Sequence, residues 1–376
     1  MIDAEWVKAV LRPRQDVSHI AVVLPCLNEE ETLLSTCRSL GFGTSGVGQA
    51  PQAILVIVDN GSTDNTISIA REIQNTSLPG TVLVSREEER GYVPPRHSGN
   101  GLAKSFGETN GIPPTQILVL QADADTLYHE HYIEQMRLAA QAAGANTLLE
   151  AKAEFPPGFQ NNFPGYIALL AETDDRFFRT IDCRAADDLV CTDAVCGYRL
   201  SDYLAWGGHI REYREDGEEI HAETTRLRIR SIAHGAGKVL VEDAVALPSE
   251  RKTLLRPAEE FATAGFPRES GWRAAWRRKY IGPDTAEAFG TARDHPDVVE
   301  AIRLRERHLA ALFGLLPLHA ATTLGAPPAT ADPRLLEIVA SLPARDANTL
   351  LHRPGQLLVD VLDVVDHRGA ALDALF

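Results

Sequence analysis

Residues 18–32 read SHIAVVLPCLNEEET and join an apolar run to a polar turn. The run at 19–24 is short and continuous, which is typical of a buried strand in a parallel sheet. Over residues 29–40 the apolar side chains recur at helical spacing, and Asn28 is a suitable cap for that helix. A strand that leads directly into a helix predicts an α/β fold.

The same alternation continues along the first half of the chain. It predicts further buried strands at 53–58, 81–84 and 117–120, and helices at 66–73 and 131–143. Another strand is expected later in the chain, at 239–242. Strands and helices that alternate in this way form a mostly parallel sheet flanked by helices, with right-handed crossovers.

The length of 376 residues suggests two domains, or one large domain with an appendage. We expect a catalytic domain at 1–250, a basic linker or lid at 251–282 and a helical region at 283–376. In that last region helical periodicity is clear at 298–313, 334–342 and 356–365. We expect these C-terminal helices to aid folding or to join copies of the chain into a homo-oligomer.

Charge and composition exclude several classes of protein. The formal net charge of −15 argues against a nucleic-acid binder. Five cysteines without a CxxC pair support neither a disulfide framework nor a zinc knuckle, so a reducing, cytoplasmic location is expected. The first residues lack an apolar signal core, and no stretch reaches the ~20 apolar residues of a membrane span.

Polar clusters follow the first, second and fourth predicted strands. They read PCLNEE at 25–30, DNGSTDNT at 59–66 and QADAD at 121–125. In open parallel sheets, ligands bind at the edge formed by the carboxyl ends of the strands, where these clusters are expected to lie. Asp59 is placed to accept hydrogen bonds from a nucleobase or ribose, although a capped turn is the simpler interpretation of the same residues.

Asp123 and Asp125 are two residues apart, and on a strand such residues share a face. Their carboxylates can therefore converge on one hard divalent cation, Mg²⁺ or Mn²⁺, which also bridges a diphosphate. Without a cation the two charges repel each other. The alternative is an ordinary polar strand end.

Together these clusters resemble the family 2 glycosyltransferases, which have the GT-A fold. PCLNEEETL is similar to that family's opening motif, QADADT to its DxD segment, and VDNGSTDNT to its VDDGSTDGT loop with Asn60 in place of an Asp. Residues 91–99, GYVPPRHSG, are similar to G-x-x-x-A-R-N-x-G, with Pro95 and His97 as departures. The resemblance covers about 18–250, and the order and spacing of the motifs agree.

The resemblance implies a nucleotide-diphosphate sugar as donor, bound by the half at 18–150, and an acceptor bound by the half at 151–250. Asp123 and Asp125 would hold the Mg²⁺ or Mn²⁺. Some GT-A enzymes carry a metal-binding His after the strand predicted at 239–242, where this chain has Arg251, a cation for the diphosphate. The implied donor residues are Pro25, Leu27, Asn28, Glu30, Asp59, Arg96, Asp123 and Arg251.

Two further stretches resemble the segments of this family that bind and activate the acceptor. Trp206-Gly207-Gly208-His209 resembles the family's acceptor-site segment G-G-[FH]. HAETTRLRIR at 221–230 is similar to E-D-x-x-L-x-x-R, and aligning Leu227 and Arg230 places Glu223 at the catalytic base. The competing bases are Glu218 and Glu219, and we interpret His221 as a surface residue.

These features predict a metal-dependent, inverting transferase that moves a sugar to a hydroxyl of a soluble small acceptor. UDP is the expected nucleotide, because it is the commoner one in the resembled family. One alternative is a retaining enzyme, since RHSGNGLAKS has some likeness to R-x-G-K-G of glucosyl-phosphoglycerate synthases, with Asn100 replacing the Lys. Another is a nucleotide-sugar-binding protein without turnover.

Overall fold

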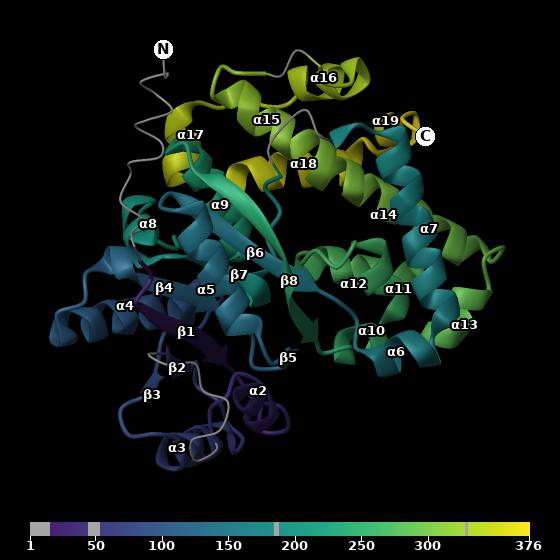
Figure 1. The fold of residues 1–376 in the computed structure, drawn as a ribbon. Coiled ribbons are helices and arrows are strands. Elements are labelled where there is room, and N and C mark those ends of the chain that lie inside the picture. The colour runs from purple at the N-terminus through teal and green to yellow at the C-terminus, as the bar shows by residue number, and fades with distance from the viewer. Residues whose placement is uncertain (1–15, 44–52, 184–187, 328–329) are drawn as a thin grey trace, which may run out of the picture.

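The computed structural model describes residues 16–43, 53–183, 188–327 and 330–376. It shows a mixed sheet with helices on both faces and a group of helices formed by the C-terminal third of the chain (Figure 1). The expectation that the first residues lack a signal segment concerns residues 1–15, which lie outside the described ranges.

The sheet has eight strands in the order β3-β2-β1-β4-β7-β6-β8-β5. The first four are parallel, β7 is antiparallel to both β4 and β6, β8 is parallel to β6, and β5 is antiparallel to β8. The strands are β1 (His19–Cys26), β2 (Ala53–Asp59), β3 (Val82–Arg86), β4 (Ile117–Gln121), β5 (Thr126–Tyr128), β6 (Thr147–Ala153), β7 (Cys196–Arg199) and β8 (Gly237–Pro248). The predicted α/β class and parallel strands are confirmed, whereas β5, β6 and β7 were not predicted.

Each central strand buries both of its faces. In β1, Ile20 and Val22 belong to an apolar core that includes residues of α2 (Leu33–Ser39), α3 (Thr66–Thr76) and α5 (Tyr132–Ala143). Ala21 and Val23 belong to the core on the other face, with residues of α4 (Val93–Asn110), α8 (Leu200–Ala205) and α9 (Glu223–Ala233). Because helices cover both faces, the strands are apolar at nearly every position rather than at every second one.

The helix predicted over 29–40 is shorter in the structure, and the expectation that Asn28 caps it was wrong. Residues 30–32 form a turn, and α2 starts at Leu33. Asn28 has a φ of 57°, in the left-handed region that Asn tolerates better than most residues. Its side chain and backbone are bonded to the loop after β2 instead, as described below.

The other helices lie between and after the strands of the sheet. They are α6 (Pro157–Asn162), α7 (Pro164–Thr180), α10 (Arg251–Leu255), α11 (Pro257–Ala262), α12 (Ser270–Lys279), α13 (Ala286–Thr291), α14 (Pro296–Leu309), α15 (Leu316–Thr323), α16 (Pro333–Ala340), α17 (Ala347–His352), α18 (Gly355–His367) and α19 (Gly369–Asp373). A π-helical turn at Ala310–Leu315 joins α14 to α15. The three helices predicted in the C-terminal region correspond to α14, α16 and α18.

The predicted divisions at residues 250 and 283 do not follow the packing. Phe177 of α7 and Ile229 of α9 share one apolar core with the C-terminal helices, which Figure 1 shows gathered on the side of the molecule away from α3. The expected linker at 251–282 is largely helical, and its Arg268 is fully buried between His308 and Asp366. The sequence pattern misled here because α7 and α9 are covered by helices that lie far away along the chain.

Candidate active site

The loops after β1 and β2 are joined by hydrogen bonds at the carboxyl edge of the sheet. The Asn28 backbone N–H donates to Ser62 Oγ at 2.9 Å, and Asn28 Oδ1 accepts from the Thr63 N–H at 2.8 Å. Glu30 Oε2 accepts from the Asn65 N–H at 2.9 Å. Asn28 and Glu30 therefore shape the loops that were predicted to hold the nucleotide.

Asp59 lies at the end of β2 and is 1% exposed. Its Oδ1 accepts from the Ser62 N–H at 3.0 Å, and its other oxygen is 4.0 Å from Arg86 Nε. Pro25 is half-buried within β1, and Leu27 is exposed just beyond it. The structure thus brings the predicted nucleotide residues of the first two strands to one edge of the sheet.

Arg96 is a buried guanidinium on α4 that links three side chains from distant parts of the chain. Its Nε donates to Glu223 Oε1 at 2.7 Å, and one terminal nitrogen donates to Asp123 Oδ1 at 2.6 Å. The other terminal nitrogen donates to Gln121 Oε1 at 3.2 Å. Burial opposes its charge, but Asp123 and then Glu223 raise the pKa of Arg96 well above its usual value.

A fourth charged side chain of this cluster, Asp193, was missed by the sequence analysis. It lies in a 3-10 turn before β7, and its Oδ1 accepts from the Thr224 N–H at 3.0 Å. Burial, followed by the charge of Glu223, raises the pKa of Asp193 to about 7. Nothing in the stretch CTDAVC marks this residue, because only the fold brings it to the start of α9.

One cleft of about 530 Å³ collects these groups. Arg96, Asp123, Asp125, Asp193 and Glu223 all line it. Among the described residues, the side chains of Asn28, Glu30, Asp59 and Arg251 do not line this cleft. The structure therefore brings the DxD carboxylates and Glu223 into one cleft, next to the edge that carries the loops predicted to hold the nucleotide.

Asp123 and Asp125 lie in the turn between β4 and β5, so the expectation that they share a face of one strand was wrong. They meet at the cleft because of the turn. Two carboxylates on one wall are a donor set of hard oxygens that suits Mg²⁺ or Mn²⁺. Each is already paired with an arginine, Asp123 with Arg96 and Asp125 with Arg251, as expected where negative charge gathers.

Arg251 was predicted to contact the diphosphate of the donor. In the structure one of its terminal nitrogens is 2.8 Å from Glu29 Oε2 and 3.0 Å from Asp125 Oδ2. It is about half exposed, at the start of α10. Arg251 therefore links the first polar loop to the DxD turn, and its neighbour Lys252 lines the cleft.

The segment 206–209, predicted to bind the acceptor, is largely buried beside α9. Gly207 and Gly208 have φ values of 80° and 68°, so the chain turns sharply there. Arg230 donates to the carbonyls of Trp206 and Gly208, and the Trp206 Nε1–H donates to Asn146 Oδ1 at 3.0 Å. None of these four residues is among the described residues that line the cleft.

Glu218 and Glu219, the alternative candidates for the base, are paired with other residues. Glu218 accepts from the Ser270 N–H at 2.9 Å, and Glu219 is 3.1 Å from an Arg211 nitrogen. His221 lines the cleft and packs against Tyr92 with ring centroids 4.4 Å apart, so its interpretation as a surface residue was wrong. Because His221 precedes Glu223 by two residues, both line the same cleft.

Comparison with known protein families gives one match that covers much of the sheet. Residues 21–203 match the family described as Glycosyl transferase family 2. These residues, just under half of the chain, belong to this family. The match includes the loops after β1 and β2, Arg96 and the DxD turn, and it ends before α9. The chain is a glycosyltransferase, as the motifs predicted.

One curated relative shares a shorter region with this glycosyltransferase. Glucosyl-3-phosphoglycerate synthase of Mycolicibacterium smegmatis is 35% identical over 107 residues, which are 28% of this chain and 32% of that protein. The chain thus matches about a third of the relative's length.

Solved structures of other glycosyltransferases show weaker similarity. S. aureus TarS 1-349 in complex with UDP has a TM-score of 0.41 and 15% identity, and the match covers 89% of both chains. Mannosyltransferase PcManGT from Pyrobaculum calidifontis, in complex with GDP-Man and Mn²⁺, has a TM-score of 0.43 and 16% identity, with coverage of 96% of this chain and 87% of that one. Among the described residues, no helix of this glycosyltransferase is long and apolar enough to cross a bilayer.

Proposed function

We propose that this glycosyltransferase moves a sugar from a nucleotide-diphosphate sugar to a hydroxyl of a soluble small acceptor, with inversion at the sugar carbon. UDP is the nucleotide we expect. The observation that carries the proposal is the shared cleft, in which Glu223 meets Asp123 and Asp125. A base and a site for the leaving diphosphate are the two parts that an inverting transfer needs.

Glu223 is the base in this proposal. It stands at the first position of α9, is 6% exposed, and is oriented by the 2.7 Å hydrogen bond from Arg96. Only one of its oxygens is used in that bond. The other would take the proton of the acceptor hydroxyl as the oxygen attacks the sugar carbon and the bond to the diphosphate breaks.

Asp123 and Asp125 would hold Mg²⁺ or Mn²⁺, which supplies charge stabilisation for the departing diphosphate. Other residues of the chain would bind the nucleoside and the diphosphate. The loops around Asn28 and Asp59 would hold the nucleoside, and the Arg96 guanidinium bonds to both Asp123 and Glu223. Lys252, on the cleft wall, would face the diphosphate.

A variant of Glu223 tests the proposal. Glu223→Gln keeps an oxygen to accept from Arg96 but removes basicity, so we expect turnover to fall by roughly 10²-fold or more with donor affinity unchanged. Glu218→Gln and Glu219→Gln are the matched controls and should stay active. An active Glu223→Gln beside an inactive Glu219→Gln would show that the base has been misassigned.

A retaining outcome is the second candidate, favoured by the 35% identity to glucosyl-3-phosphoglycerate synthase. NMR of the fresh product separates the two, because inversion and retention give opposite anomers. The donor itself is found by thermal shift with UDP-, GDP- and dTDP-sugars, each with and without Mn²⁺. A true donor raises the melting temperature by mass action.

A further inference from the structure

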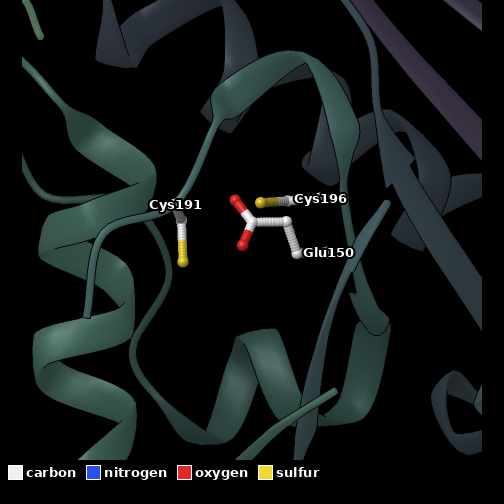
Figure 2. A group of neighbouring side chains, drawn as sticks. All are labelled: Glu150, Cys191 and Cys196. Carbon is white, nitrogen blue, oxygen red and sulfur yellow. The ribbon is translucent and has the colours of Figure 1, made fainter. Parts of the chain in front are cut away.

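Two cysteines and a glutamate meet behind the wall of the cleft. Glu150 lies on β6 directly opposite Cys196 of β7, and Cys191 precedes that strand. Their carboxylate oxygen and sulfur atoms lie within 4.8 Å of one another (Figure 2). Both cysteines are buried, and Cys191 also borders the cleft.

The group has the composition of a metal site, but its carboxylate is already occupied. Glu150 Oε1 accepts from the Thr192 N–H at 2.7 Å, and Glu150 Oε2 is 2.7 Å from the ammonium of Lys238. A cation bound here would compete with that ammonium. The two thiols are the remaining groups of this cluster.

The two sulfur atoms lie within 4.8 Å of each other. Burial, followed by a side-chain hydrogen bond with Cys191, raises the pKa of the Cys196 thiol well above its usual value. Cys196 Sγ also donates to the Thr192 carbonyl at 3.1 Å. Cys196 is thus a protonated thiol next to Cys191, and Cys191 is the one that a small oxidant in the cleft can reach.

We propose that Cys191 and Cys196 form a disulfide when the protein meets hydrogen peroxide, and that this bond switches the transferase off. Cys191 attacks the peroxide, the O–O bond breaks, and a sulfenic acid and one water form. Cys196 then displaces the sulfenic oxygen as a second water, so two thiols lose two electrons and two protons.

The loop between the two cysteines explains how a disulfide between them would affect the proposed transfer reaction. Thr192, Asp193 and Ala194 all line the cleft. Asp193 accepts from the Thr224 N–H, and the Cys191 N–H donates to Thr225 Oγ1 at 3.1 Å, so the loop is tied to the first turn of α9. Closing the sulfur atoms to the ~2.05 Å of a disulfide pulls on both ties next to Glu223.

The experiment uses the full chain, reduced and then treated with hydrogen peroxide. Peptide mapping should show a 191–196 crosslink, with a loss of about 2 Da and protection of both cysteines from alkylation. Turnover should fall roughly 10- to 100-fold, since a ~1 Å displacement from productive geometry can cost ~10²-fold, and dithiothreitol should restore it. The effect on turnover rests on the proposed function, whereas the crosslink does not.

Variants separate this pair from the other cysteines. Cys196→Ser should form no crosslink and should trap the Cys191 sulfenic acid, which dimedone labels. Cys183→Ser, a half-buried cysteine outside the pair, should leave crosslinking and inactivation unchanged. A crosslink that leaves turnover intact, no crosslink at all, or purified protein that holds stoichiometric Zn²⁺ lost in Cys196→Ser would each overturn the proposal.

Discussion

Around Arg96 the cleft holds more negative than positive charge. One buried guanidinium faces the carboxylates of Asp123, Asp193 and Glu223 and bonds directly to two of them. Carboxylates gathered in a partly dry space repel one another, so the cluster favours an additional cation. Burial and the charge of Glu223 raise the pKa of Asp193 to about 7, so this carboxyl binds a proton more readily than an isolated one.

A variant of Asp125 tests the proposed metal site at the scale of one residue. Asp125→Ala leaves Arg96 and its partners in place but removes one of the two proposed oxygen ligands, so the donor should no longer bind more tightly with Mn²⁺ than without it. Calorimetric titration of the nucleotide with and without Mn²⁺ measures this. Asp175→Ala, which removes an exposed carboxylate on α7, is the control and should keep the metal effect. Metal dependence that survives in Asp125→Ala would place the ion elsewhere.

At the scale of elements, α4 lies close enough to β1 to leave no room for a side chain at Gly99. A Cβ there would stand 2.4 Å from Val23 Cγ1, whereas a Cβ at Gly101 on the same helix would meet nothing within 4 Å. Gly99→Ala should therefore lower the free energy of unfolding by ~1–3 kcal/mol. Gly101→Ala should raise it by ~0.5–1 kcal/mol. Urea unfolding measures both, and equal effects would show that this contact is not tight.

His308 of α14 links that helix to the segment before α12. Its Nδ1–H donates to the Leu304 carbonyl at 2.8 Å, and its Nε2 accepts from Arg268 at 2.6 Å, an arrangement that needs the neutral ring. Burial, followed by the charge of Arg268, lowers the pKa of His308 to about 3, while the unfolded chain has a value near 6.5.

The neutral ring stabilises the fold above pH 6.5, and that stability is lost as the pH falls from there toward 3. The loss amounts to about 1.4 kcal/mol per pH unit, because the unfolded state binds one more proton. His308→Gln should be less stable at pH 7.5 yet lose less stability between pH 6.5 and 5. Urea unfolding at each pH compares the two slopes, and identical slopes would contradict the assignment.

At the scale of the whole molecule, the C-terminal helices belong to the core rather than to an appendage. Leu315, Leu358 and Val361 are fully buried or nearly so and share one cluster with Phe177 and Ile229. Removing 283–376 would expose that cluster and the start of α9, so we expect an aggregated or unfolded product. Circular dichroism and size-exclusion chromatography test this, and a folded, monodisperse fragment that binds donor would contradict it.

The sequence was sufficient where structure depends on neighbours along the chain. Continuous apolar runs marked β1, β2 and β4, and the polar residues after them marked the correct edge of the sheet. It was insufficient where a group acquires its role from distant partners. Asp193 needs the start of α9, and the turn at 206–209 is buried because Arg230 binds its carbonyls. The core that α7 and α9 share with the last helices likewise joins residues more than a hundred positions apart.

The strand order also has a consequence for how the chain folds as it is made. The parallel set β3-β2-β1-β4 is complete in sequence once residue 121 has been synthesised, but β8 must be inserted between β6 and β5, both of which precede it by many residues. Pairings this distant in sequence form slowly and leave strand edges open meanwhile. A nascent chain therefore carries the loops after β1 and β2 early, yet it lacks the proposed base until α9 has left the ribosome, and its core closes only with the last helices.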